Sequence, residues 1–437
     1  MAERTGSADG LTRRGLMKAA AGLSVASVLP GWVREAMAQE AGNRDWNIDA
    51  VEVVRVRGAL PTWRGINRQY QSQPLHLYDR PEVYHDAAEG ERGTYMGTHD
   101  YVKIRTRGGV EGLYGYCDGD AAVHVLGRLK DELIGKNAMA GEYLWERMYR
   151  SHRMSRAGVY MKGISYLDCA LWDVRGRILG VPVYSLLGGP TREVATCYGS
   201  CLGFSVEPGK PGPRAAALSE QGFKNQKWFL AYGPSHGAEG LALNVGLVKE
   251  LREAVGPGVN LMFDAYQAWD LQYATAWAQR VEEYRPTWIE EAFPTADMGS
   301  FVKLAGASRV PVATGEHFFN RWEVERFLEA GAIEYVQADP EWCGGVSELL
   351  KMCHLASVHG AKVVPHGHNI HAALHVVVSQ SPAVCPLVEY LLNHMDGKVQ
   401  FQVDPPKTSD GTMVLPTKPG FGIELDESKI EGMEVMG

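Results

Sequence analysis

Residues 287–317 read TWIEEAFPTADMGSFVKLAGASRVPVATGEH and contain the pattern that decides the fold. A short apolar run ends in the pair Glu290-Glu291, a helical pattern follows, and a second apolar run ends at Glu316. Neither run alternates with polar residues, which is typical of strands that are buried on both faces of a parallel sheet. The stretch therefore predicts a strand–helix–strand unit in which both strands end in a carboxylate.

The same unit recurs on both sides of this stretch. Short apolar runs follow one another at intervals of 23 to 34 residues, with helical patterns between them. Eight parallel strands are the number that closes a barrel, so residues 190–400 are predicted to form a barrel of alternating strands and helices. An open, doubly wound sheet is the alternative. The eight runs begin near Glu193, Gln226, Asn260, Thr287, Val310, Tyr335, Ala361 and Pro386.

An α+β module is predicted before the barrel, over residues 46–185. Its segments are two alternating, strand-like stretches at 51–56 and 101–106, a polar loop at 69–97 and helical periodicity over 120–179. The C-terminal residues 411–437 are too irregular to form another barrel unit. We expect them to pack back on this first module and complete it.

The composition is typical of a soluble globular protein and excludes several functions. The chain has 437 residues, of which 45% are hydrophobic and 22% charged, and its net charge is −8. An acidic balance offers no basic surface to nucleic acid or to an anionic membrane. The seven cysteines include no C-x-x-C pair, so neither a disulfide scaffold nor a zinc ribbon is predicted. An enzyme with a small-molecule substrate remains, and we expect a homo-oligomer.

The first 38 residues are predicted to be an export signal rather than part of the fold. Residues 13–14 are both arginine, residues 19–29 form a weakly apolar run, and residues 36–38, Ala-Met-Ala, supply a cleavage site before Gln39. The run is too short to span a bilayer. These features resemble a twin-arginine signal, which implies the twin-arginine export machinery and a periplasmic or secreted protein. The alternative is an alanine-rich helix of a cytosolic protein.

Titratable side chains end six successive strands of the predicted barrel. The C-terminal strand ends of such a barrel form its catalytic face, so these groups are expected to meet there. One acidic residue at such a position often caps the next helix, but a run over six strands points to a site. Converging carboxylates repel one another unless a cation neutralises them, and oxygen ligands without cysteine favour Mg²⁺ over Zn²⁺. In strand order the residues are Asp264, Glu290 with Glu291, Glu316, Asp339, His366 and Glu389.

With their flanking residues, these strand ends resemble the enolase superfamily and, within it, the mandelate racemase-like group. The motifs are FDAYQAW at 263–269, WIEEAF at 288–293, TGEH at 314–317, QADPEWCGG at 337–345, VVPHG at 363–367 and LVEYL at 387–391. The resemblance implies an α+β capping domain followed by a modified (β/α)7β TIM-like barrel. It implies that Asp264, Glu290 and Glu316 bind Mg²⁺. It also implies that Asp339 and His366 form a catalytic dyad.

Within this group the chain most resembles the L-rhamnonate dehydratase type of acid-sugar dehydratase. The shared stretches are YGPSHG at 232–237, TGEH at 314–317, WCGG at 342–345 and VPHG at 364–367. The chain departs at residues 368–371, His-Asn-Ile-His, where those dehydratases usually carry Ser-Ser-Val-Tyr. The likeness implies a Mg²⁺-dependent lyase that converts an aldonic or aldaric acid to a 2-keto-3-deoxy product through an enediolate. Glu389 would stabilise one oxygen of that anion, as a neutral acid or through a shared hydrogen bond, or form a plain salt bridge.

The second barrel strand indicates the type of reaction. Racemases and cycloisomerases of the group carry a Lys-x-Lys or similar pair there, whereas here Lys227 fills the first position and Phe229 the second. A phenyl ring moves no proton, so His366, oriented by Asp339, is predicted to be the single flexible base. One base on one face suits elimination, whereas racemisation needs groups on both faces. Lys227 is a candidate catalytic and substrate-binding residue, expected either to bind the substrate carboxylate or to pair with Glu290 or Glu291.

Three further histidines are candidate site residues. His317, next to Glu316, is expected at the rim of the metal site as a secondary acid or a substrate ligand. As a proton donor on the second face it would support an epimerase, which is the nearest alternative function. His368 and His371 are expected to line the pocket or cap the next helix. A zinc site at H-x-H is the weaker alternative, because barrel zinc hydrolases place that motif at the first strand.

The polar loop before the second strand of the first module supplies candidates for binding the distal end of the substrate. Arg92 in ERGTYMG resembles the arginine by which related capping loops hold that end, and its alternative is a solvated loop arginine. His76 and Tyr95 are weaker candidates of the same kind. A non-catalytic binding protein for acid sugars is a further alternative, although a mere binder has no use for an oriented base.

Overall fold

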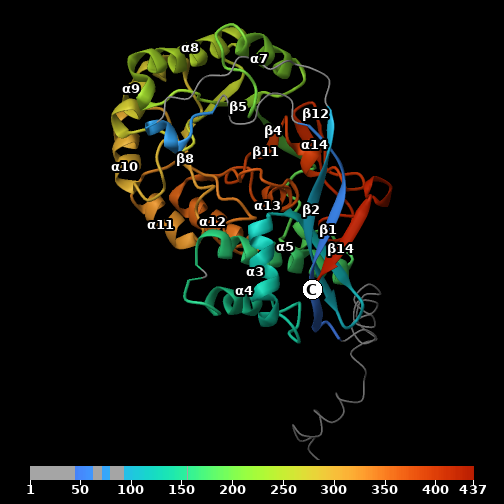
Figure 1. Cartoon of the computed structure of the whole chain (residues 1–437). Helices are drawn as coiled ribbons and strands as arrows, with labels where there is room; N and C mark the ends of the chain where they lie inside the picture. The colour runs from blue at the N-terminus through green and yellow to red at the C-terminus, as the bar shows by residue number, and fades with distance from the viewer. Residues whose placement is uncertain (1–44, 63–70, 79–92, 155) are drawn as a thin grey trace, which may run out of the picture. The chain divides into compact units, whose positions relative to one another are not determined.

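The computed structural model describes residues 45–62, 71–78, 93–154 and 156–437 (Figure 1). The predicted export signal and Arg92 lie outside these ranges. Trp46–Gly437 form one compact unit. Among the described residues, none of the helices is long and apolar enough to cross a membrane.

The predicted barrel is confirmed. Its parallel strands follow chain order from β4 to β10, and β11 pairs with the other edge of β4, which excludes the reversal of order in a doubly wound sheet. The strands are β4 Val194–Ser200, β5 Asn225–Phe229, β6 Asn260–Asp264, β7 Trp288–Glu290, β8 Val312–Thr314, β9 Tyr335–Val336, β10 Lys362–Val363 and β11 Val388–Leu391.

Helices lie between successive strands, and α7 to α12 form an arc around them in Figure 1. The helices are α7 Pro211–Glu220, α8 Gly237–Val255, α9 Leu271–Val281, α10 Met298–Ala307, α11 Arg321–Glu329, α12 Gly345–His359 and α13 His371–Ser379. A short helix, α14 (Met395–Lys398), follows β11. Seven helices between eight strands give the (β/α)7β arrangement.

The turns after the strands aim side chains at the catalytic face. After β6 the chain passes through left-handed Tyr266 and Gln267, with φ of 46° and 61°, before Asp270 caps α9 by accepting a hydrogen bond from the Tyr273 N–H. After β8, Gly315 has φ of 132°, and a Cβ there would lie 2.9 Å from the Phe318 ring. Glycine is therefore needed to set Glu316 at the strand end.

The capping module is an antiparallel sheet of order β14-β1-β2-β3 with three α-helices beside it. The long strands β1 and β2 pair from Ile48↔Thr106 to Pro61↔Thr94, and the turn between β2 and β3 contains Gly109 at φ 81°. Helix α5 is buried along most of its length and stops at left-handed Gly180. The elements are β1 Ile48–Pro61, β2 Thr94–Thr106, β3 Glu111–Cys117, β14 Gly432–Met436, α3 Gly119–Gly127, α4 Gly141–Arg150 and α5 Gly158–Leu179.

Two expectations about this module need correction. The polar loop predicted to continue to residue 97 ends earlier, because β2 begins at Thr94; its first residues are exposed and lack the apolar alternation that marks a strand. The 3-10 helix Pro74–Leu77 also lies within that loop. The C-terminal tail divides: β14 pairs with β1 as expected, whereas β13 (Thr412–Val414) pairs with barrel strand β4. The hydrogen bonds of β13 extend the barrel sheet.

The core of the barrel closes beneath the catalytic face. Tyr198, Met262, Trp288, Ala313 and Val364 are fully buried and pack together, each from a different strand or strand end. The Trp288 indole Nε1–H donates to Glu290 Oε2 at 3.0 Å, so this apolar layer also positions a carboxylate of the layer above it. A dry floor beneath charged groups lowers their access to water and strengthens their electrostatic interactions.

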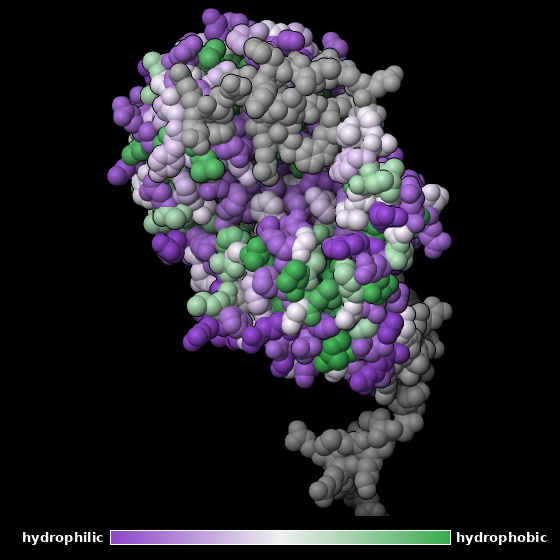
Figure 2. Space-filling model, viewed as in Figure 1, coloured by the Kyte–Doolittle hydropathy of each residue, from purple (hydrophilic) through white to green (hydrophobic). Residues whose placement is uncertain are grey.

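The surface and the cysteines bear on two further expectations. In Figure 2 the hydrophobic residues gather over the capping module, around α3, while the surface around the barrel is mostly hydrophilic. The predicted homo-oligomer stays a prediction.

All seven cysteines are free and buried, and Cys353 and Cys385 bring their sulfur atoms to 3.6 Å from one another although no pairing was predicted.

Two buried histidines of α13 predict a loss of stability in acid. His371 Nε2 lies 2.6 Å from Gln402 Oε1, and His375 Nδ1 accepts a hydrogen bond from the Tyr184 N–H at 3.0 Å. Burial lowers the pKa of His371 to about 4 and that of His375 to about 3. Unfolding returns both pKa values to about 6.5, so the unfolded chain binds more protons between these values. The free energy of unfolding should therefore fall as the pH drops from about 6.5 towards 4.

Urea unfolding measured at a series of pH values tests this expectation. We expect each histidine to contribute a slope of about 1.4 kcal/mol per pH unit within the window. The variant His375→Asn should have a shallower slope than the wild type, whatever its absolute stability. An equal slope in the two proteins would show that His375 does not carry the acid sensitivity.

Candidate active site

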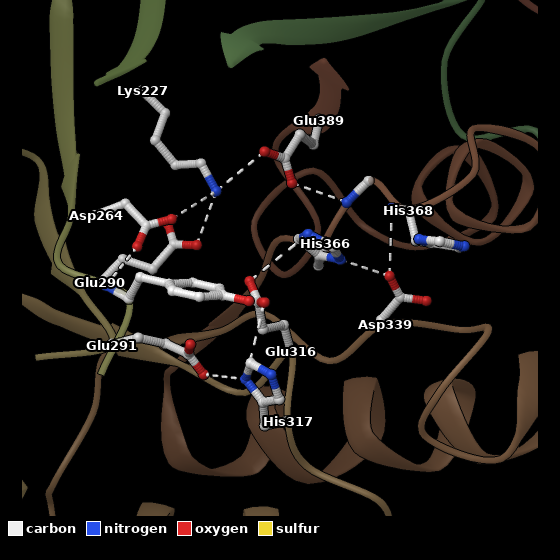
Figure 3. A network of polar contacts seen from close by, with 12 residues as sticks. Lys227, Asp264, Glu290, Glu291, Glu316, His317, Asp339, His366, His368 and Glu389 are labelled. Carbon is white, nitrogen blue, oxygen red and sulfur yellow. Dashed lines mark hydrogen bonds and ion pairs between the residues drawn. The ribbon is translucent and has the colours of Figure 1, made fainter. Parts of the chain in front are cut away.

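Three carboxylates meet at the C-terminal ends of neighbouring strands (Figure 3). Asp264 ends β6, Glu290 ends β7 and Glu316 follows β8, and each is at most 5% exposed. One oxygen atom from each residue lies within 4.8 Å of the other two. Burial, and then the charge of Glu290, raises the pKa of Asp264 well above its ordinary value, and burial raises that of Glu316 to about 7. This donor set would be neutralised by a divalent cation.

Lys227 of β5 is fully enclosed by carboxylates. Its Nζ lies 2.7 Å from Glu290 Oε1, 3.0 Å from Glu389 Oε1 and 3.5 Å from Asp264 Oδ2. Burial alone lowers the pKa of Lys227, but Glu290 and Glu389 outweigh burial and hold it well above the ordinary value. Lys227 is therefore an ammonium group. Of its two predicted roles the structure has the pairing, with Glu290 of the fourth strand and also with Glu389 and Asp264.

Glu389 of β11 is ionised and forms the plain salt bridge that was one of its two predicted roles. Burial alone raises its pKa, but Lys227 lowers it to about 2. The ammonium group of Lys227, 3.0 Å from Glu389 Oε1, favours the ionised carboxylate over the neutral acid. Its second oxygen accepts a hydrogen bond from the Gly367 N–H at 2.8 Å, which ties β11 to the turn that follows β10.

His366 and Asp339 form a hydrogen-bonded pair. His366 Nδ1 lies 2.6 Å from Asp339 Oδ2, and the other oxygen, Oδ1, accepts the Glu341 N–H at 2.7 Å. Burial alone raises the pKa of Asp339, but the hydrogen bond from His366 lowers it, so Asp339 is ionised and holds the Nδ1 proton. Nε2 of His366 is then the nitrogen that faces Glu316, at 3.6 Å from Oε2.

His317 lies on the other side of Glu316. Its Nδ1 is 2.8 Å from Glu291 Oε1 and 3.8 Å from Glu316 Oε1, and Gln267 Nε2 lies 2.8 Å from the same nitrogen. Burial alone lowers the pKa of His317, but Glu291 raises it to about 9. The Glu316 carboxylate thus lies between two imidazoles, from His317 and His366 (Figure 3). The sequence predicted Glu291 only as a possible partner of Lys227. It pairs with His317 instead, and its backbone is left-handed, with φ of 44°.

A cavity of about 910 Å³ opens onto these groups and is lined by both modules. His368 lies in its wall as predicted for a pocket residue, with Nε2 3.2 Å from Asp118 Oδ1 of the capping module. Lys162 of α5 reaches the same carboxylate at 3.0 Å. Tyr95 of β2 also lines the cavity, whereas Arg92 and the side chain of His76 lie outside the described residues.

Four residues of this wall were missed by sequence reasoning: His99, Asp118, Lys162 and Lys398. They belong to β2, the turn before α3, α5 and α14, and each looks unremarkable in its own element. Lys162 is one of five charged residues of the largely buried helix α5, so its charge alone gave no signal.

The zinc alternative is wrong for the described residues. Two groups of their side chains are placed to hold a metal ion: Asp264 with Glu290 and Glu316, and Glu291 with Glu316 and His317. His371 is not near either, because it points into the helix packing of α13 and pairs with Gln402. The H-x-H motif therefore contributes its first histidine to the dyad and its second to the cavity wall.

The chain matches two families of known domains. Residues 93–188 match the mandelate racemase / muconate lactonizing enzyme N-terminal domain, and residues 213–429 match the domain described as enolase C-terminal domain-like. The L-rhamnonate dehydratase of Saccharopolyspora erythraea is 33% identical over 335 residues, which cover 74% of this chain and 82% of that protein.

Solved structures have the same architecture. The rhamnonate dehydratase from Gibberella zeae, complexed with Mg, is 27% identical with a TM-score of 0.73, over 88% of this chain and 96% of that one. The 3,6-anhydro-D-galactonate cycloisomerase from Zobellia galactanivorans is 24% identical with a TM-score of 0.69, over 88% and 100%. These findings confirm the predicted fold and the resemblance. The chain belongs to the mandelate racemase / muconate lactonizing enzyme family of the enolase superfamily.

Proposed function

We propose that this protein is a Mg²⁺-dependent hydro-lyase that converts a sugar acid to its 2-keto-3-deoxy acid. The observation that carries the proposal is the single flexible base. His366 is held and oriented by Asp339. The second barrel strand offers only Phe229 and Lys227, and the ammonium group of Lys227 forms ion pairs with three carboxylates. The relative named L-rhamnonate dehydratase supports a sugar acid as substrate and an enzyme rather than a binding protein.

The residues that would hold the cation are Asp264, Glu290 and Glu316. They fit Mg²⁺ because they offer only oxygen donors and are buried, and because burial, followed by the charge of Glu290, raises the pKa of Asp264. When bound, Mg²⁺ would act as a Lewis acid on the substrate carboxylate and neutralise charge that develops as the α-proton leaves. Burial alone lowers the pKa of His366, and Glu316 is the largest of the charges that raise it to about 10. Neutralising Glu316 would therefore free His366 to act as a base.

The protein's own groups account for the proton transfers. His366 Nε2 takes the proton from the carbon next to the substrate carboxylate, and the electron pair of that C–H bond becomes part of a carbon–carbon double bond as the 3-hydroxyl leaves. The imidazolium, stabilised by Asp339, gives the same proton to that hydroxyl, which departs as water. The enol that remains takes up a proton at C3 and becomes the 2-keto acid. Lys227 holds Glu290 and Glu389 in place throughout.

Epimerisation is the second candidate function, and one observation favours it. His317 lies across Glu316 from His366 and its pKa is about 9, so it is a proton donor within the same cavity. An epimerase would return the proton to the α-carbon from this second side. The two functions differ in the fate of the α-proton.

A panel of aldonic and aldaric acids, incubated with the enzyme and Mg²⁺ in D₂O, separates the two. Dehydration predicts keto-acid formation, which semicarbazide detects, without deuterium at C2 of recovered substrate. Epimerisation predicts deuterium at C2 and no keto acid. A protein that neither converts nor exchanges any acid of the panel would contradict both functions.

We also propose that the protein is exported in its folded state by the twin-arginine machinery, as residues 1–38 suggest. Expression in a host that has this pathway should give a periplasmic protein that begins near Gln39. The double variant Arg13→Lys/Arg14→Lys should leave the precursor in the cytoplasm, because the arginine pair is the feature read by the exporter. Fractionation and N-terminal sequencing test this, and unchanged export of the double variant would refute it.

A further inference from the structure

The cavity has a cationic group that no carboxylate of the described residues neutralises. Three lysines line it, and two of them are paired: Lys227 with three carboxylates, and Lys162 with Asp118 at 3.0 Å. Lys398 of α14 is the third. Its Nζ lies 3.2 Å from Tyr116 Oη and 5.2 Å from the centre of that ring, and among the described residues none of the carboxylates is within ion-pair distance. Among the described residues, this ammonium group of the cavity wall therefore has no carboxylate partner.

A buried imidazole beside Lys398 also has a ring nitrogen without a hydrogen-bond partner among the described residues. His99 of β2 is 8% exposed and stacks on Tyr116 with ring centres 4.5 Å apart. Its Nδ1 has no hydrogen-bond partner among the described residues, although the side chain lines the cavity. Burial, and then Lys398, lowers the pKa of His99 to about 4, so the ring is neutral and has one N–H to donate. Buried polar atoms are rarely left unpaired, which points to a ligand here.

These groups lie at the opposite end of a row of rings from the base. The ring of Trp342 is 5.0 Å from that of His366 and 5.3 Å from that of His368, and His368 is 5.4 Å from Tyr116. Lys398 Nζ lies 5.2 Å from the centre of the Tyr116 ring, the last ring of this row. A substrate whose α-carbon is at His366 would thus extend along Trp342 and His368 and end at Lys398.

We infer that Lys398, Tyr116 and His99 bind a second carboxylate, at the end of the substrate remote from the reacting carbon, and that the substrate is an aldaric rather than an aldonic acid. The inference rests on the proposed dehydratase function and narrows it. A single unpaired ammonium group, with neutral donors from Tyr116 and His99, matches the single negative charge of a carboxylate better than the double charge of a phosphate. A terminal hydroxymethyl or methyl group would leave the ammonium group without a counter-charge.

Matched pairs of substrates test the inference. We would measure kcat/KM for keto-acid formation with hexaric acids, including D-glucarate and galactarate, with the hexonic acids of the same stereochemistry, and with L-rhamnonate. We expect the hexaric acid of the best pair to exceed its hexonic partner by about 10- to 100-fold, the range of a charge-assisted hydrogen bond.

Variants test whether Lys398 and Tyr116 are responsible for the preference for the hexaric acid. Lys398→Met should lower kcat/KM for the hexaric acid by about 10- to 100-fold, mainly through KM, and change that for the hexonic acid by less than about threefold. Tyr116→Phe, which keeps the stacking on His99, should reproduce part of this loss. Lys418→Met is the matched control, because Lys418 pairs with Glu424 and does not line the cavity.

The outcomes distinguish the subsite from the function. Preference for hexonic, 6-deoxy or phosphorylated acids, with the same preference in Lys398→Met, would overturn the subsite and leave the dehydratase standing. Absence of keto acid from every compound would overturn the proposed function and the subsite with it. A Lys398→Met protein that loses both acids equally, with an altered melting temperature, would show a structural role and overturn the inference.

Discussion

Replacement of His366 by asparagine is expected to lower kcat for keto-acid formation by at least ~10³-fold, because one imidazole serves as both the base and the acid of the proposed reaction. Asparagine retains a hydrogen-bonding group of similar size that can face Asp339, which lies 2.6 Å from the native ring, but it takes up no proton. The measurement is a steady-state assay at saturating Mg²⁺ with the acid that the panel identifies.

Two further variants test whether the loss of activity is specific to the dyad. Asp339→Asn should also be severe, because the imidazole loses the anion that fixes its tautomer and supports its basicity. His359→Asn is the matched control, since His359 is exposed at the end of α12. Activity of His366→Asn within about tenfold of the wild type would show that another group moves the proton, because a single acid–base group contributes about 10²- to 10⁴-fold to a rate.

Replacement of Asp264 by asparagine is expected to abolish turnover and weaken Mg²⁺ binding by at least ~100-fold, because an ionised ligand is lost from a three-carboxylate site. The substitution preserves shape, and the Asp264 Oδ1 that accepts the Tyr266 N–H at 2.9 Å can be replaced by the amide oxygen. Calorimetric titration of the metal-free protein with Mg²⁺ measures the affinity without reference to activity.

A control variant and a chelator experiment test the assignment of the metal site. Glu329→Gln removes one exposed carboxylate from the end of α11 and should leave Mg²⁺ affinity unchanged. Wild-type protein should lose activity in excess chelator and regain it on addition of Mg²⁺. Full activity in chelator, or Mg²⁺ affinity in Asp264→Asn equal to that of the wild type, would refute the assignment of this site.

The fold and the reactive groups were predictable because local pattern and position coincide. Each of Asp264, Glu290 and Glu316 follows an apolar run that is buried between helices and barrel interior, so the run marks the strand and the charge marks its catalytic end. Parallel strands of one barrel bring such ends together without further information. The pattern therefore indicated the barrel and the cation site, and the resemblance to the enolase superfamily implied the dyad.

Contacts between elements carried no comparable signal. Lys227 was recognised as a strand residue, but its three carboxylate partners come from three other strands, and the choice among them depends on side-chain reach. The distal cavity wall combines β2, α5 and α14, which meet only when the two modules pack together. No periodicity or motif around residues such as His99 and Lys398 predicts that they line the same cavity, so only the folded structure identifies them.

The fate of the α-proton tests the single-base account most directly. Wild-type enzyme and His366→Asn would each be incubated with the identified sugar acid and Mg²⁺ in D₂O, and recovered substrate and product examined by mass spectrometry and proton NMR. The account predicts that the wild type forms keto acid with solvent deuterium at C3 and that His366→Asn forms neither keto acid nor C2-deuterated substrate. Deuterium at C2 of the substrate recovered from His366→Asn would contradict it, because a second base, with His317 the nearest candidate, would then be removing the proton.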